Sequence, residues 1–89
     1  MKLHMLSVAR DELFEAIRYY NNQREGLGFE FANEIKESLL RIIRYPDAWP
    51  KVSKRSRTCL LKRFPFAILY RRIFIFYLLF ILDSDYWLL

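Results

Sequence analysis

Arginine and lysine gather in one stretch of this 89-residue chain, and their guanidinium and ammonium groups are the side chains best suited to bind phosphate. The stretch from Lys51 to Arg72 holds eight of the 15 basic residues and no Asp or Glu, in a chain of formal net charge +5. A positive field concentrated in this way favours an anionic partner. The candidate target-binding or anion-binding residues are Lys51, Lys54, Arg55, Arg57, Lys62, Arg63, Arg71 and Arg72.

Binding an anion does not imply cleaving it. Acid and base catalysis needs a positioned proton donor and acceptor, and the basic stretch contains no His, Asp or Glu. The single histidine is His4, and the single cysteine, Cys59, is expected to be packed and inert in an apolar strand. The sequence shows no metal-ligand spacing and no glycine-rich phosphate loop, so neither a metal nor another cofactor is expected.

The elements that position these residues follow from the apolar periodicity. Apolar residues recur at helical spacing over residues 9–20 and again over residues 29–43, which predicts two helices. The segment Gly26-Leu-Gly28 is expected to end the first helix and close an antiparallel helical hairpin. The second helix is expected to stop before Tyr45-Pro46.

Three local details are also expected. Ser7 is predicted to be the N-cap of the first helix. Glu37 and Arg41 have the spacing of an ion pair on the outer face of the second helix. Trp49, which lies between that helix and the basic stretch, is predicted to fold back as a lid on the core.

After Pro50 the pattern changes to that of strands. Residues 57–64 and 66–72 have strand length with a turn at Phe64-Pro65, and residues 73–82 are rich in β-branched and aromatic side chains. A short strand near residues 2–6 can join this antiparallel sheet. The sequence therefore predicts one α+β domain, residues 1–89, with the helical hairpin packed on one face of the sheet.

The alternation of a regular strand divides the basic side chains between two faces. Arg57 and Arg63 would share one face, and Lys62 would point to the other. Arg57, Arg63 and one of Arg71 or Arg72 could hold phosphates through their forked guanidinium donors. A bulge or an edge position would be needed to gather all the basic side chains on one face. The alternative is that these charges only solubilise and protect the sheet edge.

The last strand is apolar on both faces. Because the helices can cover only one side of the sheet, a partner is expected to cover the other, unless the strand is buried wholly within the monomer. The residues expected to bind that partner are Ile73, Ile75, Tyr77, Leu79 and Ile81. A membrane span is not expected, since ten residues as a helix reach about 15 Å, half of a bilayer core.

Ordered segments over almost the whole chain carry a family resemblance. They are residues 9–20, 26–31 and 42–50, Arg57 with residues 60–66, residues 69–71, and the terminal Asp83-Ser-Asp-Tyr-Trp87. Together they resemble the RelE/ParE toxins of type II toxin-antitoxin systems, plasmid-stabilisation type, and are closer to ParE. The resemblance implies a β-α-α-β-β-β fold and a cytoplasmic toxin, held inactive by a cognate antitoxin whose C-terminal segment wraps it. It also implies growth inhibition through DNA gyrase or ribosome-bound mRNA, and assembly as a homodimer or as a heterotetramer with the antitoxin.

One region departs from the family pattern. Relatives of this type place a His and one or two Arg in the last strand, where this chain has Leu79, Ile81 and Leu82, and Ser84 stands for a proline. These absences favour a toxin that binds a gyrase-type target without catalysis. Two alternatives stay open. One is an antitoxin-binding remnant that has lost toxicity, and the other is a RelE-like, ribosome-dependent mRNA interferase that uses Arg57, Lys62, Arg63, Arg71 and Tyr86.

Overall fold

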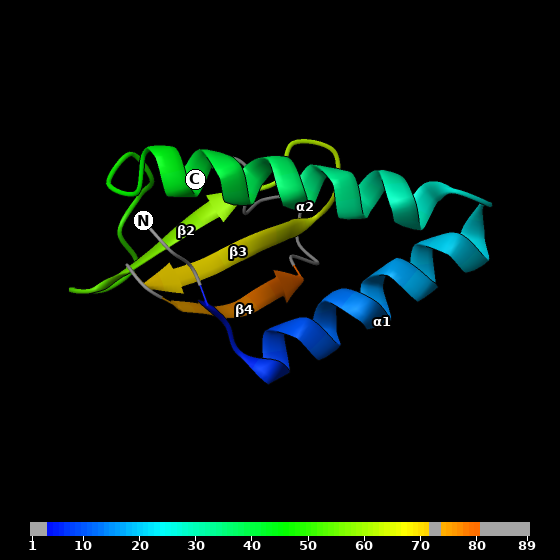
Figure 1. Ribbon diagram of the computed structural model, residues 1–89, viewed down its shortest axis with the longest axis horizontal. Helices are drawn as coiled ribbons and strands as arrows, with labels where there is room; N and C mark the ends of the chain where they lie inside the picture. The colour runs from blue at the N-terminus through cyan, green and yellow to red at the C-terminus, as the bar shows by residue number, and fades with distance from the viewer. Residues whose placement is uncertain (1–3, 72–73, 81–89) are drawn as a thin grey trace.

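The computed structural model describes residues 4–71 and 74–80, which form two helices and four strands (Figure 1). In chain order these are β1 (His4–Met5), α1 (Ser7–Gln23), α2 (Leu27–Arg44), β2 (Ser56–Leu60), β3 (Phe66–Arg71) and β4 (Phe74–Phe80). The predicted α+β class and the order β-α-α-β-β-β are both confirmed.

The four strands form one sheet in the order β1-β4-β3-β2. The pairs β2–β3 and β3–β4 are antiparallel, as expected for strands that follow one another through short connections. The short strand β1 joins β4 in parallel, with His4 opposite Phe74. A register shift between Leu69 and Tyr70 marks an irregularity in the β3–β4 ladder.

The connection between α1 and α2 turns at Gly26. Gly26 has φ 85°, in the left-handed region that only glycine adopts without strain, and its carbonyl accepts the N–H groups of Phe29 and Glu30. The predicted boundaries are wrong by a few residues, because α1 already ends at Gln23 and α2 begins at Leu27. Gly28 therefore lies in the first turn of α2, where its N–H donates to Asn21 Oδ1 at 2.7 Å.

Two expected side-chain contacts on the helices are wrong. Ser7 is the first helical residue, the N-cap position belongs to Leu6, and no side chain caps this end of α1. The Glu37–Arg41 pair is absent, since Arg41 Nη2 donates to Ser38 Oγ at 3.0 Å. The Glu37 carboxylate instead accepts from Asn33 Nδ2 at 3.5 Å.

The core lies between the helical hairpin and one face of the sheet. Four aromatic rings form its centre, with centroid separations between 4.9 and 6.4 Å: Tyr20, Phe31, Phe64 and Phe66. Alternate residues of β2 and β3 extend it, notably Cys59, Ile68 and Tyr70. Trp49 is partly buried against this cluster, which confirms the predicted lid.

The opposite face of the sheet is not open along β2 and β3. Thr58 and Ala67 belong to that face by their register, and they are 6% and 0% exposed. Ile75, Tyr77 and Leu79 lie in β4, whereas Ile73 and Ile81 lie outside the described residues. That a partner covers the last strand stays a prediction.

Candidate anion-binding surface

The fold divides the basic stretch between the two ends of the β2–β3 hairpin (Figure 1). At one end, Ser56 pairs with Arg71, and Lys51 forms a bridge with Arg57. At the other end, beyond the Leu60–Ala67 pair, lie Lys62 and Arg63. A five-residue strand at roughly 3.3 Å per residue separates the two ends by about 15 Å.

Arg63 therefore lies at the opposite end of the hairpin from Arg57 and Arg71. That these arginines bind phosphate stays a prediction. We define the proximal basic patch as the exposed basic residues at the Ser56–Arg71 end of the hairpin, namely Lys51, Lys54, Arg55 and Arg71. Arg72 also belongs to the predicted set but lies outside the described residues, as does Tyr86.

The predicted strand over residues 57–64 is also too long, because β2 stops at Leu60. A buried carboxylate explains where the chain turns. Glu34 of α2, which is 9% exposed, accepts the backbone N–H of Lys62 at 2.6 Å and that of Arg63 at 3.3 Å. Both basic side chains thus lie in a loop and both are exposed, so the alternation of a strand does not govern their direction.

Arg57 is bound to the chain itself. Its Nη1 donates to the Trp49 carbonyl at 2.7 Å and to the Asp47 carbonyl at 3.1 Å. Its Nη2 also lies 3.7 Å from the Asp47 carboxylate, and its side chain is 22% exposed. The guanidinium donors of Arg57 therefore hold the segment that connects α2 to β2, which limits what they can offer to a ligand.

Tyr70 is the register partner of Arg57 and holds the same connection. Its hydroxyl donates to the Pro46 carbonyl at 2.8 Å, and the residue is 1% exposed. Burial raises the pKa of Tyr70 to about 12, although the nearby charge of Arg57 acts in the opposite direction. Tyr70 is consequently a structural hydrogen-bond donor within the folded chain.

Arg63 belongs to a surface ion cluster. Its Nη2 lies 2.9 Å from Glu30 Oε1, while Arg24 approaches the other oxygen of the same carboxylate at the same distance. The hydrogen bonds from Arg63 and Arg24 lower the pKa of Glu30. The Arg63 guanidinium also lies 5.4 Å from the centroid of the Phe64 ring, and its side chain remains 58% exposed.

Sequence reasoning missed the carboxylates that surround the hairpin in space. The basic stretch itself contains none, but Glu30, Glu34 and Asp47 reach it from α2 and from the following connection. Glu34 could have been found, because it lies on the same helical face as the apolar Phe31 and Ile35. A charged residue on a buried stripe requires a partner.

Cys59 is fully buried, as predicted, and burial raises the pKa of its thiol above the ordinary value. Within residues 4–71 and 74–80, no helix combines the length and the apolar character that crossing a bilayer requires.

No protein-family model and no curated protein sequence matches this chain. A solved structure does match it, described as "Chromosomal ParDE TA system from P. aeruginosa". The TM-score is 0.70 at 16% sequence identity, and the match covers 91% of this chain and 96% of the other. The chain therefore adopts the RelE/ParE-like fold that its sequence resemblance implied, with an architecture shared over nearly its full length with a chain of a ParDE system.

Proposed function

We propose that this chain is the toxin of a type II toxin-antitoxin system, which inhibits growth by binding a gyrase-type target and is neutralised by a cognate antitoxin. The observation that carries the proposal is the agreement in fold with a chain of a ParDE system over 91% of this chain. The ordered sequence segments that resemble RelE/ParE toxins support the same assignment.

The geometry of the hairpin supports inhibition by binding over RNA cleavage. Among the described residues, two of the three carboxylates near the basic residues are already occupied, Glu34 by two backbone N–H groups and Glu30 by two arginines. The third, Asp47, lies 3.7 Å from the Arg57 guanidinium. Arg57, the first residue of the candidate nuclease set, donates to two carbonyls of its own chain. General acid and base catalysis needs groups that are positioned and available to exchange a proton with the substrate.

The proximal basic patch is the surface that we assign to the target. Its exposed lysines and arginines lie at the same end of the hairpin, so an acidic surface or a phosphate backbone could contact several of them at once. Lys62, at the far end, would contribute only to a partner that spans the hairpin.

A gyrase supercoiling assay tests this proposal, run in parallel with purified ribosomes and mRNA. The purified chain is expected to block supercoiling in a concentration-dependent manner and to leave the mRNA intact. Reversing two charges of the patch, Lys54→Glu with Arg55→Glu, should raise the concentration for half inhibition by about tenfold or more, because like charges then face each other across the interface.

The matched control is Arg18→Glu with Lys36→Glu, which changes the net charge equally at exposed positions on the two helices. This control should inhibit nearly as well as the unmodified chain. Cleavage of the mRNA without an effect on gyrase would contradict the proposal and favour the interferase. Neither effect, from a folded chain that still binds its antitoxin, would favour a remnant without toxicity.

A further inference from the structure

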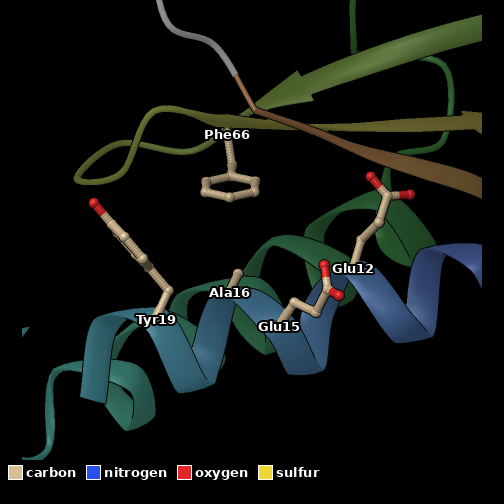
Figure 2. A pocket seen from close by; sticks show the side chains of 5 residues that line it. All are labelled: Glu12, Glu15, Ala16, Tyr19 and Phe66. Carbon is tan, nitrogen blue, oxygen red and sulfur yellow. The ribbon is translucent and has the colours of Figure 1, made fainter. Parts of the chain in front are cut away.

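A pocket of about 350 Å³ opens between α1 and the start of β3. Its lining residues are Glu12, Glu15, Ala16, Tyr19 and Phe66. Figure 2 shows that the first four rise from α1, and that the Phe66 ring points down toward the helix from the sheet above it. The pocket thus has two carboxylates on one wall and aromatic rings beside and opposite them.

The spacing along α1 creates this arrangement. Glu12, Glu15 and Tyr19 are separated by three and four residues, so they share one face of the helix. Ala16, which lies between them, is buried and has too small a side chain to fill the space below Phe66. The pocket therefore stays open because Ala16, at its floor, has the smallest side chain of the lining residues.

One carboxylate oxygen in this pocket is shielded from solvent and accepts no hydrogen bond from the described residues. Glu12 Oε1 is buried, and no hydrogen-bond donor reaches it within the described structure. Burial, and secondarily the charge of Glu15, raise the pKa of Glu12 above its ordinary value. A carboxylate with one desolvated and unpaired oxygen is unfavourable for the isolated chain, whereas a cation placed in the pocket would relieve it.

We propose that this pocket takes an arginine side chain of a partner protein. A guanidinium group can donate to both carboxylates through its planar fork and lie against the rings of Tyr19 and Phe66, while its aliphatic stem covers the apolar floor. A lysine ammonium fits less well because it is a compact and strongly hydrated charge. That the partner is the antitoxin rests on the proposed function; the arginine specificity rests on the pocket alone.

The charge of the chain makes such an anchor selective. The whole chain is basic, with a formal net charge of +5, and its hairpin ends attract acidic segments. An acidic and aromatic pocket on the same molecule therefore selects a partner segment that carries an isolated arginine at a defined position along its docking path.

Titration of the folded chain with N-acetyl-arginine amide, followed by two-dimensional NMR, tests this inference directly. The expected result is a saturable set of shifts confined to the amides of residues 12–19 and Phe66. N-acetyl-citrulline amide, which has nearly the same shape without the charge, should bind at least about tenfold more weakly. Shifts of equal size with citrulline, or shifts spread over all surface carboxylates, would overturn the proposal.

The variant Glu12→Gln with Glu15→Gln should abolish these shifts while the chain stays folded. Because the raised pKa of Glu12 reports an unfavourable charge, removing that charge should not lower the unfolding temperature at neutral pH. The control Glu25→Gln with Glu37→Gln changes two exposed carboxylates elsewhere and should leave arginine binding unchanged. Retained binding in the pocket variant would refute the site.

Arginine binding should also weaken as the pH falls through the raised pKa of Glu12, since protonation removes the negative charge that the guanidinium meets. None of these measurements depends on toxicity. A chain that stops growth but ignores arginine would refute only the pocket, and a harmless chain that binds arginine would refute only the proposed function.

Discussion

Gly28→Ala is expected to lower the free energy of unfolding by about 3 kcal/mol or more, at the upper end of what overpacking costs. A Cβ at this position would lie 2.6 Å from Asn21 Cγ and closer still to the carbonyl oxygen of Ile17. The helix backbone cannot move away without separating α1 from α2. For a domain of this size the melting temperature should fall by about 12 °C or more, measured by circular dichroism.

Gly26→Ala provides the matched control two residues earlier. This glycine has a positive φ, but nothing lies within 4 Å of the Cβ that alanine would add. The expected loss is therefore only the cost of a left-handed conformation, about 1 to 2 kcal/mol. If alanine at position 26 proved as damaging as alanine at position 28, the close approach of the two helices would not be what fixes the hairpin.

Glu34→Ala is expected to destabilise the chain by about 3 kcal/mol, measured by urea denaturation. The substitution removes a carboxylate that accepts the backbone N–H groups of Lys62 and Arg63, and hydrogen bonds to charged groups contribute more than neutral ones. Both donors would lose their partner in a part-buried loop. Amide hydrogen exchange at positions 62 and 63 should accelerate more than exchange in α1.

Two companion variants separate this anchor from a general effect of lost charge. Glu34→Gln keeps one oxygen as an acceptor and should cost about 1 kcal/mol. Glu37→Ala removes an exposed carboxylate of the same helix and should change stability by less than about 0.5 kcal/mol. A loss at position 34 as small as that at position 37 would show that the loop does not depend on Glu34.

The two helices and the three later strands could be predicted because each depends on a local pattern. Apolar residues at helical spacing predicted α1 and α2 to within a few residues, and the change of period after Pro50 predicted the strands. The ends of the two helices were harder to predict. Gly28 was expected to stop the first helix, but its lack of a side chain serves the packing of α2 against Ile17 and Asn21 instead.

The candidate site was less predictable because its properties depend on contacts between distant residues. Basic residues that are close in sequence separate in space once β2 and β3 pair, since antiparallel pairing places Lys62 far from Arg71. Arg57 looked available for phosphate, yet it holds the Asp47 and Trp49 carbonyls. No residue near Arg57 in sequence reveals that role.

The pocket beside α1 was likewise hidden in the sequence. Glu12 and Glu15 read as ordinary charges of a helix surface, and only the fold brings Phe66 over them. The burial of the Glu12 Oε1 atom becomes evident only in the folded structure.

The most direct test of the central claim is growth after controlled induction of this chain in a bacterial host, with and without the product of the adjacent open reading frame. If the chain is a growth-inhibiting toxin with a cognate antitoxin, colony-forming units should fall steeply when the chain is expressed alone. They should recover fully when the two proteins are co-expressed. The Gly28→Ala variant should lose the effect in proportion to its loss of folded protein. Undiminished growth while the unmodified chain accumulates in its folded form would contradict the account.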